Sequence, residues 1–162
     1  DVVLVSCGII KGNAHEIVAF RKAFHAEHVA LFTDIHVKHS KLLSRFSIVE
    51  SAHRSITAGS DALILTGKWT ADAPDIKELA RVRAAVGQFP IFIGSGVDER
   101  NIGALLCYAN AVIVSTSLKR GGTKNGEVNV KAYTQRVDKK KVLRLVTATH
   151  WKIIRRVLMK RA

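Results

Sequence analysis

The stretch ALILTGKWTADAPDIKELARVRAAVGQFPIFIGSG, residues 62–96, decides the fold class of this 162-residue chain. It begins and ends with short apolar runs rich in β-branched residues, ALILTG (62–67) and PIFIG (90–94). Between them, DIKELARVRAAV (75–86) repeats its apolar residues at helical spacing, and its first turn carries acidic residues that complement the helix dipole. Strand, helix and strand in this order predict a βαβ unit, and therefore an α/β protein.

Three further runs have the composition of strands, namely VVLV (2–5), VALFTDIHV (29–37) and AVIVS (111–115). Such nearly continuous apolar strands are typical of a parallel sheet that is covered on both faces. Five strands in a chain of this length fit an open, doubly wound parallel sheet, whereas a closed (β/α)8 barrel usually needs about 250 residues. Length alone therefore favours the open sheet.

The net charge of +13 is unevenly distributed along the chain. Residues 1–117 hold 12 Lys and Arg against 11 Asp and Glu, while residues 118–162 hold 14 against 2. This pattern excludes a uniformly basic nucleic-acid-binding domain and predicts an α/β domain over 1–146 followed by a basic helix or tail over 147–162. HWKIIRRVLMKRA (150–162) is expected to cover the sheet as a final helix; contact with an anionic membrane or with RNA is the alternative.

The sequence shows no long apolar segment and no secretory signal, so we expect an intracellular protein, cytoplasmic or mitochondrial. Cys7 and Cys107 form no spaced cluster and are expected to be buried, reduced thiols. The two H-x-x-H pairs, at 25–28 and 36–39, lack a third ligand at a diagnostic spacing. We therefore predict neither a metal nor another cofactor.

Polar residues interrupt the strand FTDIHVKHS (32–40) near its carboxyl end. Strand alternation would place Asp34, His36 and Lys38 on one side, at the end of a parallel strand where ligands bind in such folds. There they would act as general acid or base and as an electrostatic clamp. An Asp34–Lys38 ion pair beside a hydrogen-bonded histidine is the structural alternative. Lys68, at the end of the next strand, either contacts an anionic ligand or is a solvated loop residue.

Two successive strands run into small residues that suit an anion. IFIGSGVDERNI (91–102) contains Gly94, Ser95 and Gly96, and IVSTSLK (113–119) contains Thr116 and Ser117. Glycines let main-chain N–H groups approach an anion closely, and paired loops of this kind bind phosphate in many barrels. The sequence therefore predicts a phosphate site at Gly94, Ser95, Gly96, Thr116 and Ser117, with ordinary turn chemistry as the alternative.

Read together, DIHVKHS (34–40), ALILTGKWTADAPD (62–75), IFIGSGVDERNI (91–102) and AVIVSTSLK (111–119) resemble the BtpA family. The resemblance covers residues 8–119 and VDKKKVLRLV (137–146), which is similar to the family's last barrel helix. It implies a phosphate-binding (β/α)8 barrel, here incomplete with about five parallel strands, because family members carry several βα units before the segment matching GIIKGNAHE. Ser115, where the family favours glycine, and NVKAYTQR (129–136), which resembles an insertion, depart from the pattern.

The family takes its name from a role in photosystem I biogenesis in cyanobacteria, and the resemblance implies no particular reaction. We expect the chain to bind a small phosphorylated ligand, and any activity to be that of a lyase, isomerase or transferase on a phosphorylated metabolite. The alternative is a non-enzymatic assembly or biogenesis factor for a larger protein complex. Open edges of a partial barrel also predict pairing with further chains, including a homo-oligomer.

Overall fold

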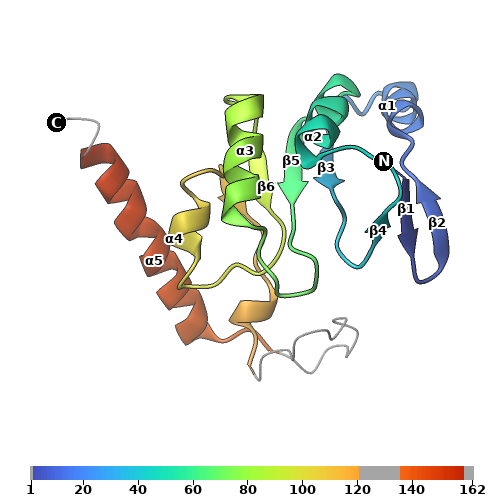
Figure 1. The fold of residues 1–162 in the computed structure, drawn as a ribbon. Coiled ribbons are helices and arrows are strands. Elements are labelled where there is room, and N and C mark those ends of the chain that lie inside the picture. Colours follow the sequence, from blue (N-terminus) through green and yellow to red (C-terminus); the bar gives the residue numbers. More distant parts are fainter. Residues whose placement is uncertain (1, 121–135, 159–162) are drawn as a thin grey trace.

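The computed structural model describes residues 2–120 and 136–158, with side chains up to residue 149 (Figure 1). Its strands are β1 (Val2–Val5), β2 (Gly8–Lys11), β3 (Phe32–Ile35), β4 (Lys41–Leu42), β5 (Ala62–Leu65), β6 (Ile91–Ile93) and β7 (Ala111–Val112). Its helices are α1 (Ala14–Ala23), α2 (Ile48–Thr57), α3 (Ile76–Val86), α4 (Ile102–Leu105) and α5 (Lys139–Leu158), with one 3-10 turn, η1 (Thr116–Leu118).

Four strands form a parallel sheet in the order β3-β5-β6-β7. The α/β class with a parallel sheet is therefore confirmed. The predicted helix over 75–86 is α3, which starts after Asp75; the carboxylate of this residue accepts the main-chain N–H groups of Lys77 (2.8 Å) and Glu78 (3.0 Å). This cap satisfies two donors that the first turn of a helix would otherwise leave without an acceptor.

The first of the five expected strands forms, but outside the parallel sheet. β1 pairs antiparallel with β2 and β4 in a separate three-stranded sheet, so the expectation of a fifth parallel strand here is wrong. The apolar run Gly8–Lys11 follows β1 after a tight turn at Ser6 and Cys7, and closing so short a loop costs little entropy.

The two cysteines, Cys7 and Cys107, are free and exposed, which corrects the expectation that they are buried.

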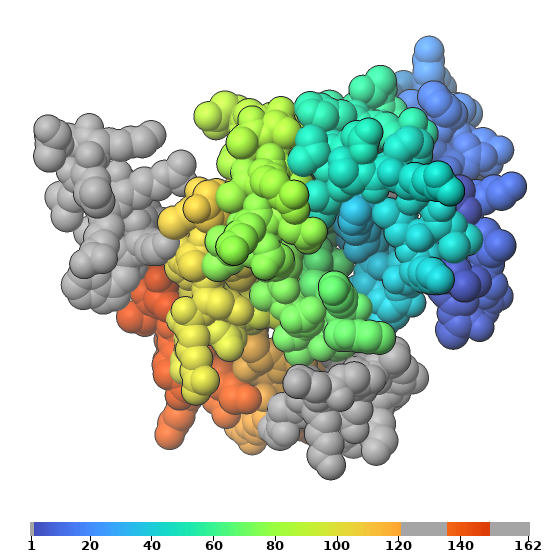
Figure 2. All heavy atoms as spheres, in the orientation of Figure 1, coloured from blue at the N-terminus to red at the C-terminus, as the bar shows by residue number. Residues whose placement is uncertain are grey.

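The hydrophobic core lies on one face of the parallel sheet. Leu63, Leu65, Ile91 and Ile93 are fully buried there, and α2, α3, α4 and α5 all contribute side chains to the same cluster. Figures 1 and 2 show α2, α3 and α4 side by side over the sheet. Each fully buried aliphatic side chain contributes about 1.5–3 kcal/mol, so this layer supplies much of the stability.

The opposite face of the parallel sheet carries apolar side chains that no described segment fully covers. Phe32 is 42% exposed and Ile113 is 49% exposed, while Ile64 and Phe92 are half-buried. The rings of Phe32 and Phe92 contact each other with centroids 4.7 Å apart. Helices on one face only are the arrangement of a barrel, in which the other face lines the interior, and not of a doubly wound sheet. The sequence led us to expect helices on both faces, but within the described residues helices cover only one face of the sheet.

The last helix crosses the boundary expected at residue 146. α5 continues from Lys139 to Leu158, so the predicted tail begins within it, and Leu145 packs in the core. The side chains of 150–162 lie outside the described residues, as do residues 129–135 of the insertion predicted at 129–136. In the part of the chain that the structure describes, no helix combines the length and apolar character needed to cross a membrane.

Candidate functional site

A cavity of about 510 Å³ opens at the carboxyl ends of the four parallel strands. It is lined by the loops after β3, β5, β6 and β7 and by the start of α5. Of the residues predicted from sequence, it contains Lys38, Gly94, Ser95, Gly96, Thr116 and Ser117. It also contains His39, Thr70, Asp98 and Lys141, which the sequence reasoning did not assign to the site.

The loop after β6 presents main-chain donors to this cavity. Within the described residues, the N–H groups of Ser95, Gly96 and Val97 donate to no protein acceptor, although all three residues line the cavity. Successive main-chain N–H groups in a turn form a concave site that suits an anion. The loop could therefore hold an anion, and the phosphate site expected from the sequence stays a prediction.

The two glycines of this loop also have a packing role. Gly96 has φ +66°, and a Cβ there would lie 2.1 Å from the main-chain nitrogen of Ala73. A Cβ at Gly94 would lie 2.6 Å from the Cγ2 atom of Ile64 on the neighbouring strand. Glycine is therefore required at both positions for the loops to pack, independently of any ligand.

The loop after β7 is tied to the loop after β6 and to α5. The Ser117 hydroxyl donates to the carbonyl oxygen of Val97 at 2.6 Å. The Lys141 ammonium donates to the carbonyl oxygen of Lys119 at 2.6 Å, which holds this cation beside the cavity. Hydroxyls, main-chain donors and an ammonium group from three elements thus surround one end of the cavity.

The loop after β3 is tied to the loop after β5 through His39. Its N–H donates to the carbonyl oxygen of Lys68 (3.1 Å), and its Nε2 lies 2.8 Å from the Thr70 hydroxyl. The ring of His39 also packs edge-on against Trp69, with centroids 5.5 Å apart. Sequence reasoning considered His39 only as half of an H-x-x-H pair, and nothing local indicates that its partner is Thr70.

The predicted polar group Asp34, His36 and Lys38 does not converge. β3 ends at Ile35, and His36 takes φ +55°, so strand alternation stops before it. The Nε2 of His36 lies 3.4 Å from the hydroxyl of Ser51 on α2, on the core side of the sheet, and burial lowers the pKa of His36. Asp34 is paired in register with Ile64 and lies on the opposite face. The expectation that all three side chains share one side is therefore wrong for His36.

Lys68 lies outside the cavity as well. It lines a second, more open concavity of about 590 Å³ with residues at the start of α3. Its main-chain N–H donates to Asp72 Oδ2 at 2.9 Å, which shapes the turn between β5 and α3. The structure therefore groups only Lys38, of the four residues predicted as catalytic, with the predicted phosphate residues.

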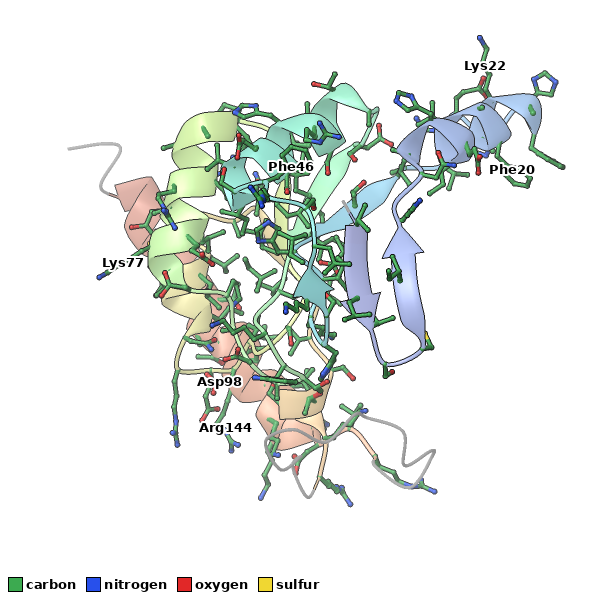
Figure 3. All side chains as sticks on the ribbon, turned by 45° about the vertical axis from the view of Figure 1, so that its right-hand side comes forward. Phe20, Lys22, Phe46, Lys77, Asp98 and Arg144 are labelled. Carbon is green, nitrogen blue, oxygen red and sulfur yellow. The ribbon has the colours of Figure 1, made fainter. Side chains whose placement is uncertain are left out.

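Asp98 lines the cavity, but its carboxylate accepts hydrogen bonds from its own turn. Its carboxylate accepts the N–H groups of Arg100 (2.8 Å) and Asn101 (3.1 Å), before α4. Figure 3 shows Asp98 and Arg144 in the same lower region of the molecule, where Arg144 pairs with Glu99 at 2.6 Å. Among the described residues, no three His, Cys, Asp or Glu side chains are grouped closely enough to hold a metal ion.

The ionisation of Asp34 makes the stability of the fold depend on pH. Neighbouring protein desolvates its carboxyl group and raises its pKa from 3.8 to about 6, although the charge of Lys38 opposes the shift. In the unfolded chain this carboxyl group ionises near pH 4, whereas in the folded protein it ionises near pH 6. Its contribution to the free energy of unfolding is therefore fully present below pH 4 and is lost as the pH rises through 6. We expect Asp34→Asn to raise the free energy of unfolding at pH 7 by about 1 kcal/mol, a value reduced for the exposure of the side chain.

Urea unfolding between pH 4 and 7 measures this effect. The variant should gain stability over the wild type as the pH rises, with little difference at pH 4. Asp61→Asn is the control of opposite sign, because Asp61 accepts from the Leu31 N–H and from Arg21, both at 2.6 Å, and these bonds lower its pKa. An Asp34→Asn variant that loses stability at pH 7 would contradict the assignment.

Four parallel strands, helices on one face and a polar cavity at the strand ends together define part of a (β/α)8 barrel. The BtpA family profile matches residues 1–150, and the chain belongs to the BtpA family. It is 38% identical over 129 residues to the photosystem I biogenesis protein BtpA of Synechocystis sp., covering 79% of this chain and 45% of that protein. An uncharacterized protein of Thermococcus kodakarensis is 33% identical over 139 residues, covering 85% of this chain and 51% of the relative.

The likeness to a solved structure agrees with this class. N-(5'-phosphoribosyl)anthranilate isomerase from Pyrococcus furiosus is similar with a TM-score of 0.51 and 17% sequence identity, over 83% of this chain and 56% of that one. At this identity the likeness shows the fold alone. The chain spans about half the length of the curated relatives that it matches.

Proposed function

We propose that this protein binds a small phosphorylated ligand in the cavity at the carboxyl ends of β3, β5, β6 and β7. The observation that supports this most directly is the run of three main-chain N–H groups, at Ser95, Gly96 and Val97, that have no acceptor among the described residues. Buried or partly buried donors are costly to leave unmade, and a phosphate oxygen is a strong acceptor for them.

The surroundings of these donors favour an anion. The Lys141 ammonium lies beside the cavity, and the loop of Thr116 and Ser117 adds hydroxyl groups. Lys38 has an electrostatic role in this proposal, while Asp34, His36 and Lys68 lie away from the ligand. Any reaction would be an isomerase, lyase or transferase step on a phosphorylated metabolite.

Inorganic phosphate and ribulose monophosphate should raise the melting temperature of the chain, because a ligand that binds the folded state stabilises it. We expect Lys141→Met to weaken binding about tenfold, which corresponds to the loss of a charge-assisted hydrogen bond. We expect a smaller effect from Ser117→Ala, because the Ser117 hydroxyl donates to the Val97 carbonyl oxygen and acts on the ligand only by holding the loop after β6. Isothermal titration calorimetry measures the affinity.

Lys139→Met is the matched control, because Lys139 is exposed in the same helix turn and does not line the cavity. The melting temperature of each variant without ligand checks that it folds. If Lys139→Met and Lys141→Met weakened phosphate binding equally, the effect would come from net charge alone, and the assignment of Lys141 to the site would be wrong.

A non-enzymatic assembly factor is the second candidate. It is favoured by the 38% identity to a photosystem I biogenesis protein and by the exposed apolar residues on the open sheet face, such as Phe32. A purified chain that retains a defined partner protein and shows no response to phosphate would favour this candidate over the first.

Location and association are also part of the proposal. We place the protein inside the cell, in the cytoplasm or the mitochondrion; a Caenorhabditis elegans relative, 36% identical over 117 residues, carries "mitochondrial" in its name. A homo-oligomer would cover the open sheet face and its edges. Contact of 150–162 with a membrane or RNA stays a prediction, because those side chains lie outside the described residues.

A further inference from the structure

The cavity has cationic groups from opposite ends of the parallel sheet. Lys38 follows β3 at one edge, whereas the phosphate loops follow β6 and β7 at the other side of the order β3-β5-β6-β7. Neighbouring strands lie about 4.8 Å apart, so the loops after β3 and β6, two strand spacings apart, are separated by roughly 10 Å. The cavity therefore has room for a second anionic group between a phosphate held by the β6 loop and the loop after β3.

Lys38 is available to a ligand. It is half-buried at the cavity and, within the described residues, its ammonium group makes neither an ion pair nor a hydrogen bond. The adjacent His39 fixes the main chain through Lys68 and Thr70, at 3.1 and 2.8 Å. An anchored lysine loses less conformational freedom on binding an anion than one on a mobile loop.

The other end of the cavity differs in its donors. The Lys141 ammonium is held by the Lys119 carbonyl oxygen, and the N–H groups of Ser95, Gly96 and Val97 are directional donors. Such a combination suits the oxygens of a phosphate monoester. Lys38 by contrast offers a single flexible point charge, which suits any second anionic group.

We propose that the ligand carries two anionic groups at opposite ends of a short carbon chain, as a sugar bisphosphate does. One phosphate binds the β6 and β7 loops and Lys141, and the second anion binds Lys38. This inference rests on the proposed phosphate site and specifies its substrate class. The cavity volume of about 510 Å³ accommodates such a molecule, since small-molecule sites commonly measure about 300–1,000 Å³.

The nearby carboxylates are consistent with this arrangement. Asp98 uses its carboxylate on the N–H groups of Arg100 and Asn101. Asp34 is close enough for the charge of Lys38 to act on its carboxyl group, although no ion pair joins the two. Asp34 therefore competes weakly with the second anion for Lys38, and Asp34→Asn should tighten the binding of a bisphosphate.

The test compares ribulose bisphosphate with ribulose monophosphate by titration calorimetry on the full chain. We expect the bisphosphate to bind at least about tenfold more tightly to the wild type. Lys38→Met should remove this advantage by weakening bisphosphate binding about tenfold more than monophosphate binding, whereas Lys38→Arg should retain most of it. Lys22→Met is the control for net charge, because Lys22 is exposed on α1 and points away from the body in Figure 3.

The outcomes separate this inference from the proposed function. If the monophosphate binds but the bisphosphate binds no tighter, the second anion site is wrong and the phosphate site stands. Equal weakening of both ligands by Lys38→Met also overturns the inference, since Lys38 would then belong to the first site. If neither ligand nor inorganic phosphate binds, the phosphate site itself is wrong, and both proposals fail together.

Discussion

Gly96→Ala is expected to lower the free energy of unfolding by about 3–5 kcal/mol, a loss in the range of the most damaging single substitutions. The alanine Cβ would lie 2.1 Å from the Ala73 nitrogen and 2.2 Å from the Asp72 carbonyl carbon, and both atoms belong to the main chain. The loop between β5 and α3 must therefore move. The left-handed conformation of Gly96, with φ +66°, adds about 1–2 kcal/mol of strain.

Gly87→Ala is the matched control. Gly87 has a similar φ of +61°, but a Cβ there meets no atom within 4 Å. Only backbone strain applies, because φ +61° with ψ −116° is a combination that glycine adopts far more readily than alanine, so we expect a loss of about 1–3 kcal/mol. Urea unfolding measures the free energy of unfolding of both variants. A larger loss in Gly96→Ala reports the steric clash with the main chain, whereas equal losses would show that the loop after β5 moves aside for the new side chain.

This prediction bears on how the phosphate site is tested. Because Gly96 holds two loops together, a Gly96→Asp variant would lose ligand binding whether or not phosphate contacts the loop. Ser117 and Lys141 are better positions, since each contributes one polar group that can be removed without placing an atom inside the neighbouring main chain.

Arg83→Met is expected to cost about 2 kcal/mol, because four acceptors, two of them in partly buried contacts, lose a charged donor at once. The guanidinium group donates to the carbonyl oxygens of Tyr108 (2.7 Å), Gly87 (2.6 Å) and Phe89 (2.9 Å), and to Asn110 Oδ1 (2.6 Å). These bonds join the end of α3 to the segments entering β6 and β7. Methionine keeps much of the apolar stem, so the loss reports the polar contacts.

Arg81→Met provides the comparison on the same helix. The Arg81 side chain is 66% exposed and lies 3.6 Å from Glu78, one turn earlier. Exposed pairs of this kind contribute about 0.5 kcal/mol or less. Guanidinium chloride unfolding should therefore separate the two variants clearly, and similar midpoints for both would mean that the Arg83 bonds are replaced by water at little cost.

Local patterns explain which parts of the fold could be predicted. The helix over 75–86 depends on its own periodicity and on the Asp75 cap, and the loops proposed to bind phosphate follow strands that are recognisable from composition. Their convergence follows from one rule, that the carboxyl ends of parallel strands meet at one edge of a sheet. Lys38 and Ser117 therefore line the same cavity, as the sequence suggested.

The predictions that were wrong depend on which strands pair and on the backbone dihedral angle of one residue. VVLV reads as a strand, but nothing within it distinguishes a parallel neighbour from the antiparallel partners that it has. His36 leaves the expected side because one left-handed residue ends the alternation. Lys141 contacts Lys119 across 22 residues, so its place at the cavity depends on the path of the chain between them.

The open face of the parallel sheet means that the two sides of each strand tolerate substitution differently. A polar residue in place of Ile93 would be buried among helices without a partner, whereas one in place of Ile113 would still reach water. Folding of the chain as it stands thus restrains every second residue of these strands. The residues between them, Phe32 and Phe92 among them, accept polar replacements at a lower cost, and another surface packed against them would raise that cost.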